Sequence, residues 1–232
     1  MKIAAVASST VALSSSGAVY RWGNVMAEAG GTFDRTKPVV ANVLPTGVFA
    51  ADVAISSGTG ETTPVVLGSD GQVYAYGSNF FGQLGLGTKT TDLLNDSTKT
   101  PQRALLPAGV RAISLAASGS VTCVLASTGE PYCWGGVQDL ANYPEYQGPL
   151  DLTLATPYKL AWPANETIAH MAVVGSSAYF TTSTGSLYVW KAPSMFPPGT
   201  PIQVPTSVTL PAGVTARATF TGACFTTPQG EL

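Results

Sequence analysis

Residues able to perform catalysis or to hold a metal are few in this chain, and their spacing fits no known arrangement. Its 232 residues include one histidine, His170, and three cysteines, Cys123, Cys133 and Cys224. A nucleophilic triad needs a base beside its nucleophile, and a structural zinc site needs four suitably spaced ligands. Neither pattern occurs. We therefore expect no enzymatic activity, no catalytic residue, no cofactor and no metal.

The amino-acid composition limits the fold class and the kinds of binding partner to be expected. Charged residues make up 10% of the chain, against 25 glycines and 17 prolines, a balance typical of short strands joined by turns. The net charge is -2 with only 11 lysines and arginines, so little positive charge is present to bind a phosphate backbone, and we expect no nucleic-acid partner. No apolar run reaches the roughly 18 residues of a membrane-spanning helix, so we expect no membrane insertion.

One pattern recurs four times at intervals of about 55 residues. It consists of glycine, two residues, tyrosine, one residue and an aromatic residue, and it predicts a β-hairpin with glycine at the end of the turn. The aromatic pair points to one face of its strand and is predicted to pack between stacked sheets. The signature positions are Gly17, Tyr20, Trp22, Gly71, Tyr74, Tyr76, Gly129, Tyr132, Trp134, Gly185, Tyr188 and Trp190.

A second marker has the same period. It reads Leu-Pro-x-Gly-Val from Leu44, Leu106 and Leu210, and a degenerate copy begins at Trp162. Two independent markers with one period indicate tandem copies of a single all-β unit. The copies are predicted over residues 1–52, 53–110, 111–167 and 168–214, with an incomplete fifth copy over 215–232.

The repeat resembles that of the regulator of chromosome condensation (RCC) family, whose units form the blades of a seven-bladed β-propeller. The second copy, residues 68–87, is the best match, and its tail Asn79-x-x-Gly82-Gln83-Leu84-Gly85-x-Gly87 is specific but intact only once. The histidine that the family commonly has before the turn is replaced in every copy, at Ser9, Thr63, Val121, Ser177 and Gly222. We interpret His170 as an ordinary strand residue.

The resemblance implies an all-β fold, a partial and open β-propeller of about four blades plus a fragment. A seven-bladed ring would need roughly 390 residues. The two ends of the chain carry overlapping pieces of the repeat instead of complementary ones. These observations predict that the chain is a piece of a longer protein.

Two cysteines occupy opposite strands of the third hairpin. If Ser127, Thr128 and Gly129 form a three-residue loop, Cys123 and Cys133 face each other at a distance that permits a disulfide. Cys224 aligns with Cys123 in the fifth copy. The alternative is a pair of buried free thiols in a reducing compartment. The disulfide favours a secretory or extracellular location, whereas the family resemblance favours the cytoplasm or nucleus.

The predicted function is a non-enzymatic scaffold that binds other proteins through the loops of its blades. Two alternatives stay open. The family resemblance implies guanine-nucleotide exchange on a small GTPase, for which no residue here gives direct support. The cysteine pattern favours a secreted binder or receptor ectodomain.

Overall fold

The chain folds into a succession of small antiparallel sheets that follow one another along the sequence. The computed structural model describes residues 1–6, 8–23, 36–41, 44–57, 62–90, 97–136, 153–192, 204–216, 218–219 and 225–226. These residues form four four-stranded sheets, called blades 1 to 4, and one two-stranded hairpin. Cys224, with most of the predicted fifth copy, lies outside the described residues.

Blade 1 contains β1 (Lys2–Val6), β2 (Ser9–Leu13), β3 (Val19–Gly23) and β4 (Val39–Val40). Blade 2 contains β5 (Ala50–Ser57), β6 (Thr62–Gly68), β7 (Val73–Ser78) and β8 (Ser97–Arg103). Blade 3 contains β9 (Ala112–Ser118), β10 (Val121–Ala126), β11 (Pro131–Gly135) and β12 (Tyr158–Lys159), with a short 3-10 helix, η2, at Thr153–Ala155. Blade 4 contains β13 (Ile168–Val174), β14 (Ser177–Thr182), β15 (Leu187–Lys191) and β16 (Thr206–Val208). The last hairpin is β17 (Ala218–Thr219) and β18 (Phe225–Thr226).

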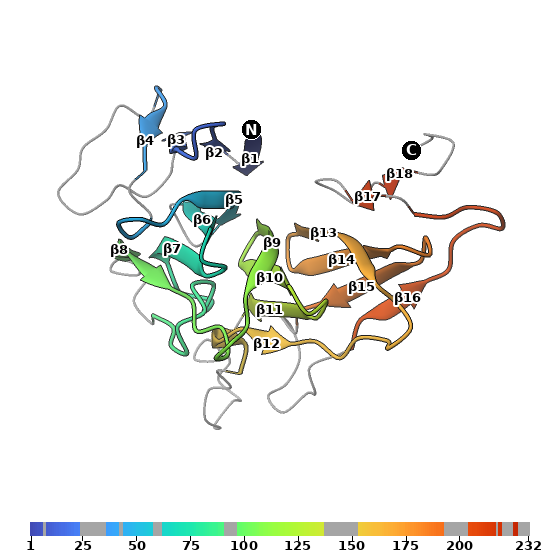
Figure 1. Ribbon diagram of the computed structural model, residues 1–232. Helices are drawn as coiled ribbons and strands as arrows, with labels where there is room; N and C mark the ends of the chain where they lie inside the picture. The colour runs from blue at the N-terminus through green and yellow to red at the C-terminus, as the bar shows by residue number, and fades with distance from the viewer. Residues whose placement is uncertain are drawn as a thin grey trace, which may run out of the picture.

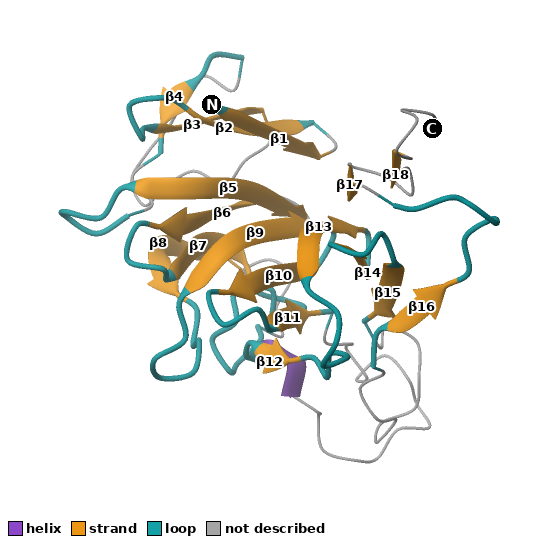
Figure 2. Cartoon of the chain, turned by 45° about the vertical axis from the view of Figure 1, so that its right-hand side comes forward, coloured by secondary structure: helices purple, strands orange, loops and turns teal. Residues whose placement is uncertain are grey.

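The blades are arranged around a common axis. Figure 1 shows the first strand of each sheet toward the middle of an arc and the fourth strand at its outer edge. Consecutive first strands contact one another, from β1 through β5, β9 and β13 to β17. Figure 2 shows the same stack of sheets from another side. The described residues form an arc and not a closed ring, which confirms the expected all-β, open and partial propeller.

The signature glycine closes each hairpin turn. In blade 2 the Gly71 N–H donates to the Gly68 carbonyl at 2.9 Å, and Gly71 has a φ of 74°. A three-residue hairpin loop needs this left-handed conformation at its last position, and glycine adopts it without steric cost. The Gly71 carbonyl then accepts a hydrogen bond from the N–H of Ala112, at the start of blade 3. The turn therefore also joins two blades.

The Leu-Pro marker forms the turn that leads from one blade into the next. In three copies the valine N–H donates to the proline carbonyl, at 3.1 Å for Val48, 3.0 Å for Val110 and 3.0 Å for Val214. Such four-residue turns reverse the chain over a short distance. They bring the chain from the outer strand of one blade to the inner strand of the next.

The inner strands carry a small residue at one matching position. Ala4, Ala54, Ala116 and Ala172 pair with the corresponding residues of the second strands. Because the first strands of adjacent blades lie side by side near the axis, a large side chain there would separate them. Alanine at this position allows the blades to approach closely.

The signature aromatic residues lie in the interfaces between blades. Tyr76, Trp134 and Trp190 are fully buried, each in a cluster with residues of the preceding blade. Tyr20 and Trp22 of blade 1 are half-buried. The aromatic pair thus serves as packing between consecutive sheets in blades 2, 3 and 4.

The intact repeat tail fastens blade 2 to blade 3. The buried indole N–H of Trp134 donates to the Gln83 carbonyl at 3.0 Å, and the Gly87 N–H donates to the Ala155 carbonyl at 2.8 Å. The Asn79 side chain shapes the tail by donating to the Thr88 carbonyl and accepting from the Leu84 N–H. Together these bonds hold the tail against the neighbouring blade.

An ionic contact connects the inner strands of three blades. Lys2 Nζ of β1 lies 2.6 Å from Asp52 Oδ1 of β5. Asp52 Oδ2 accepts from the Leu115 N–H of β9 at 3.3 Å, and Lys2 Nζ also lies 3.5 Å from the Leu115 carbonyl oxygen. Lys2, Asp52 and Leu115 therefore tie blades 1, 2 and 3 together near the axis.

The packing of the tail predicts a difference between two glycine substitutions. Gly85 and Gly109 both have positive φ, of 71° and 82°. A Cβ at Gly85 would lie 2.8 Å from Trp134 Nε1, whereas a Cβ at Gly109 would meet nothing within 4 Å. We expect Gly109→Ala to lower the free energy of unfolding by about 1 kcal/mol through backbone strain alone. Gly85→Ala should lower it by about 3 kcal/mol, because steric overlap is added.

Urea denaturation monitored by tryptophan fluorescence measures both effects. Equal losses for the two variants would contradict the close contact between the tail and Trp134.

Candidate protein-binding groove

The two cysteines of the third hairpin are paired across the sheet. Cys123 of β10 and Cys133 of β11 are register partners with Cα atoms 4.1 Å apart, and their Sγ atoms form a disulfide of 2.10 Å. Both residues are fully buried in the cluster between blades 3 and 4. The disulfide closes a loop within one hairpin and does not join two blades.

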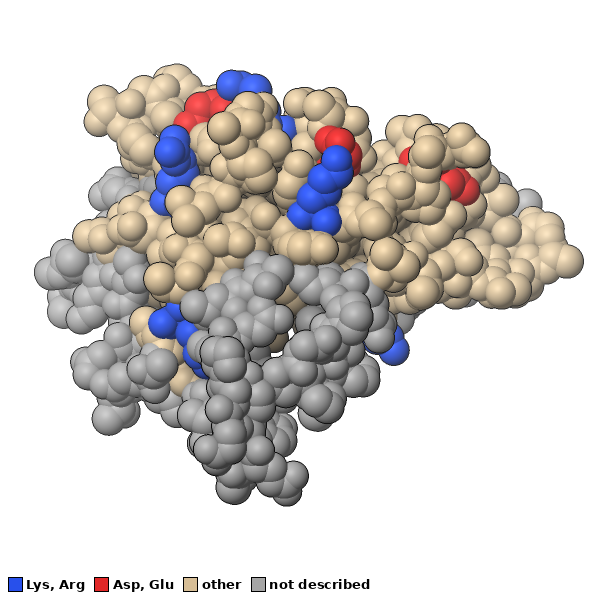
Figure 3. All heavy atoms as spheres, turned by 90° about the horizontal axis from the view of Figure 1, so that it is seen from below, with Lys and Arg blue, Asp and Glu red and all other residues tan. Residues whose placement is uncertain are grey.

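The described carboxylates are occupied by internal partners. Asp52 binds Lys2, Asp70 accepts from the Tyr74 hydroxyl at 2.6 Å, and Glu130 lies 2.6 Å from Lys159 Nζ. Glu166 accepts from the hydroxyl groups of two blade 4 turn residues at 2.6 and 2.9 Å, and these bonds lower its pKa. Figure 3 shows the acidic side chains visible from that side gathered along its upper edge, with basic side chains next to two of them. These carboxylates stabilise turns and blades.

The described residues contain no group of three or more histidine, cysteine or acidic side chains placed to hold a metal. His170 lies on β13 with its side chain exposed. Within the same part of the chain no helix is long and apolar enough to cross a membrane.

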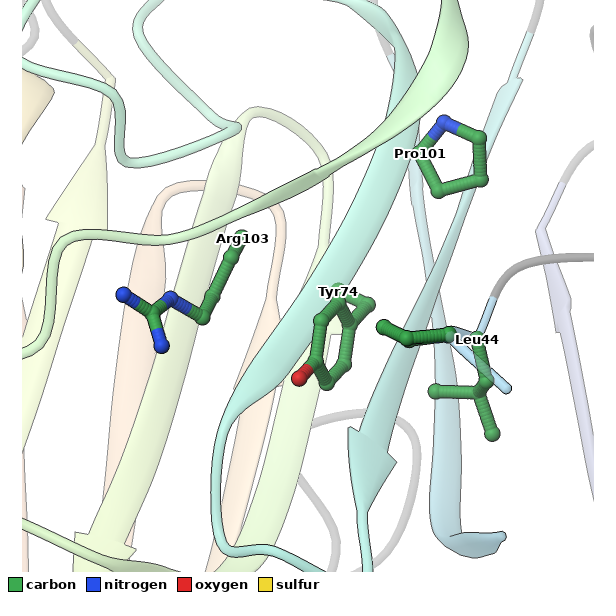
Figure 4. Close-up of a pocket in the computed structure, with 5 residues that line it drawn as sticks. Leu44, Tyr74, Pro101 and Arg103 are labelled. Atoms are coloured by element: carbon green, nitrogen blue, oxygen red, sulfur yellow. The ribbon is translucent and has the colours of Figure 1, made fainter. Parts of the chain in front are cut away.

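An open groove lies at the junction of blades 1 and 2. Its volume is about 570 Å³, and it is lined by Leu44, Pro45, Tyr74, Pro101 and Arg103. Leu44 and Pro45 come from the turn that enters blade 2, Tyr74 from β7, and the other two residues from β8. Figure 4 shows the Tyr74 ring between Leu44 on one side and Arg103 on the other. We name this feature the Tyr74 groove.

The floor of the Tyr74 groove is held rigidly. Tyr74 is 7% exposed, and its hydroxyl donates to Asp70 Oδ2. Burial, followed by the hydrogen bond to Asp70 and the negative charge of Asp70, raises the pKa of Tyr74 to about 12. Tyr74 is therefore neutral at physiological pH and presents an apolar ring with a fixed orientation.

Arg103 is the charged element of the groove. Its backbone pairs with Tyr74, and its side chain is exposed. Among the described residues no carboxylate forms an ion pair with it. The groove thus combines apolar walls with one exposed positive charge that forms no ion pair with a described carboxylate, a combination suited to binding a ligand.

Sequence reasoning identified part of this groove. It singled out Leu44, Pro45 and Tyr74, but only as repeat markers with a structural role. Pro101 and Arg103 were missed because the connection from β7 to β8 differs in length from its counterparts in other copies. The available signal was the recurrence of a basic residue beside the signature tyrosine, as Arg103 in blade 2 and Lys159 in blade 3.

Comparisons with known proteins agree with this architecture. The model of the regulator of chromosome condensation (RCC1) repeat matches residues 70–125. Human HERC2, an E3 ubiquitin-protein ligase, is 25% identical over 181 residues, which cover 78% of this chain and 4% of that protein. Human HERC3, a probable E3 ubiquitin-protein ligase, is 27% identical over 126 residues, which cover 53% of this chain and 12% of that protein.

Solved structures share the fold. Human WBSCR16 superposes with a TM-score of 0.64 at 18% identity, over 90% of this chain and 52% of that one. Yeast RCC1 (Prp20) bound to Kap60 superposes with a TM-score of 0.62 at 22% identity, over 93% of this chain and 50% of that one. The chain is an RCC1-like β-propeller. It spans about half the length of these propellers and a small part of the HERC ligases.

The RCC1-like assignment bears on the location of the protein. The relatives named here lend no support to the secretory location that the cysteine pattern favoured. Location in the cytoplasm or nucleus stays the expectation from the family resemblance. The redox state of Cys123 and Cys133 in cells therefore becomes an informative measurement.

The disulfide makes a direct prediction. Native protein denatured in the presence of an alkylating reagent, without reductant, should leave Cys123 and Cys133 unmodified in peptide mass spectrometry. Replacing both cysteines with alanine should lower the free energy of unfolding by about 2 to 3 kcal/mol, because the cross-link restricts the unfolded chain. A reduced and denatured sample, in which both are modified, is the control. Alkylation of both cysteines in unreduced protein would contradict the pairing in cells.

Proposed function

We propose that this RCC1-like chain is a non-enzymatic module that binds other proteins. The observation that carries the proposal is the Tyr74 groove, an apolar depression on a stack of sheets with one exposed cation, Arg103, at its side. Rigid scaffolds with recessed apolar surfaces bind partners at low entropic cost. The internal pairing of every described carboxylate is consistent with a binding role.

The structural relatives supply a precedent for protein partners. One solved structure is that of yeast RCC1 (Prp20) bound to Kap60. Another is that of Prp20p from Saccharomyces cerevisiae, described with its binding properties to Gsp1p and histones. These partners belong to those proteins. For the present chain they support a protein partner of unidentified nature.

Cross-linking in cells tests the scaffold proposal. The protein, carrying a photo-activatable residue at Pro45 on the rim of the groove, should form a specific cross-link to another polypeptide, identified by mass spectrometry. The same residue placed at exposed Leu105 provides a control outside the groove. Absence of any specific cross-linked protein at either position would contradict a scaffold function.

Guanine-nucleotide exchange is the second candidate, favoured by the likeness to yeast RCC1 and by the description of Prp20p with Gsp1p. The expected result is faster release of a fluorescent guanine nucleotide from a small GTPase such as yeast Gsp1p in the presence of the protein. A catalytically intact yeast Prp20p sample is the positive control. Release at the spontaneous rate at saturating protein would exclude exchange on that GTPase and leave the scaffold proposal unaffected.

A secreted binder or receptor ectodomain is the third candidate. It depends on the Cys123–Cys133 disulfide, and the alkylation measurement described above bears on it directly. Ligase activity is a property of the HERC proteins named above, which this chain matches over a small fraction of their length.

A further inference from the structure

The basic residue beside the signature tyrosine has different surroundings in blades 2 and 3. Arg103 pairs with Tyr74, and Lys159 pairs in the same way with Tyr132. Lys159 is neutralised within its own blade by Glu130, whose carboxylate lies 2.6 Å from Nζ. This contact raises the pKa of Lys159 and lowers that of Glu130.

Blade 2 lacks the corresponding acid. Glu130 follows the turn glycine Gly129, and the residue that follows Gly71 is Gln72. Gln72 is neutral, and its amide lies 3.4 Å from the Val110 carbonyl. Blade 2 therefore has no carboxylate at the sequence position from which Glu130 reaches Lys159 in blade 3. An exposed cation at the end of an apolar groove favours an anionic group on the ligand.

The apolar part of the groove is open for a similar reason. In blade 4 the residue at the start of the Leu-Pro marker is Trp162, and its ring packs against Tyr188 with centroids 4.9 Å apart. The Trp162 N–H donates to the Glu166 carbonyl at 2.7 Å, so this side chain is fixed. In blade 2 the equivalent residue is Leu44, which is smaller. The space beside Tyr74 therefore stays available.

We propose that the Tyr74 groove binds an extended peptide segment of a partner protein in which a proline or leucine side chain is followed closely by a glutamate or aspartate. The proposal deepens the scaffold function and rests on it. The apolar side chain would pack against Tyr74 between Leu44 and Pro101, and the carboxylate would accept hydrogen bonds from Arg103. A groove lined by proline and tyrosine side chains suits a peptide ligand in the extended, proline-rich conformation.

The outer strand of blade 2 argues for recognition through side chains. β8 is the last strand of its sheet, so one of its edges has no neighbouring strand in the blade. Pro101 lies in this strand and has no N–H to offer to an added strand. Side-chain contacts in the groove would therefore dominate over strand addition.

Matched peptides test the proposal. The probes are acetylated and amidated nine-residue peptides with a central Pro-Leu-Pro, followed by glutamate at one of the next three positions, and identical peptides with glutamine. Binding is measured by fluorescence anisotropy with the whole chain. We expect at least one glutamate peptide to bind about tenfold more tightly than its glutamine twin, the effect of one charge-assisted hydrogen bond.

Three variants separate the charge from the apolar contact. Arg103→Gln should weaken the glutamate peptide about tenfold, to the affinity of its glutamine twin. Gln72→Glu should also weaken binding of the glutamate peptide, because it supplies to Arg103 the carboxylate that Glu130 provides to Lys159 in blade 3. Leu44→Trp, which copies blade 4, should abolish binding of both twins. Lys159→Gln is the matched control outside the groove and should leave the affinity unchanged. Circular dichroism establishes that each variant is folded.

Three results would overturn the proposal. The first is the absence of binding of every peptide to the folded wild-type protein at millimolar concentration. The second is equal affinity of the glutamate and glutamine twins, and the third is an affinity for the glutamate peptide that Arg103→Gln leaves unchanged. The cross-linking experiment tests the scaffold function separately. A cross-linked partner whose binding is insensitive to Arg103→Gln and Leu44→Trp would support the scaffold function and reject the Tyr74 groove as its binding site.

Discussion

The hydrogen bond from the buried Trp134 indole to the Gln83 carbonyl is the contact on which the arrangement of blades 2 and 3 depends. The Trp134 side chain is fully buried, and the acceptor for its indole N–H belongs to the preceding blade. The same tail then binds the segment that follows Arg103, since the Leu105 N–H donates to the Gly85 carbonyl at 2.9 Å. The end of β8, and with it one wall of the Tyr74 groove, is therefore fixed by the packing between two blades.

Much of the fold could be predicted from the sequence because its information is repeated. The signature around Gly71 and Tyr74 specifies a turn and a strand that carries two aromatic residues, and three further copies specify the same elements. The position of Cys123 opposite Cys133 could be predicted from the three-residue loop of their hairpin alone. The structure places these residues as the hairpin geometry requires.

The groove could be predicted only in part, for a physical reason. Arg103 and Lys159 occupy the same register position, but chain segments of different length precede them, so no fixed spacing relates them to the signature. The relation between Lys2, Asp52 and Leu115 is equally invisible in the sequence, because it joins residues of three different blades. Repeats reveal what the copies share, whereas a binding site arises where one copy differs from the others.

The contact of Lys2 with both Asp52 and Leu115 has a consequence for how the chain unfolds. Stacked repeats are commonly described as a linear array in which each unit interacts only with its immediate neighbours, so that stability is a sum of local terms and the ends fray independently. A side chain of blade 1 that reaches the backbone of blade 3 adds coupling between second neighbours. Detachment of the first blade would therefore also remove a contact from the third blade, so the first three blades are not linked by nearest-neighbour contacts alone.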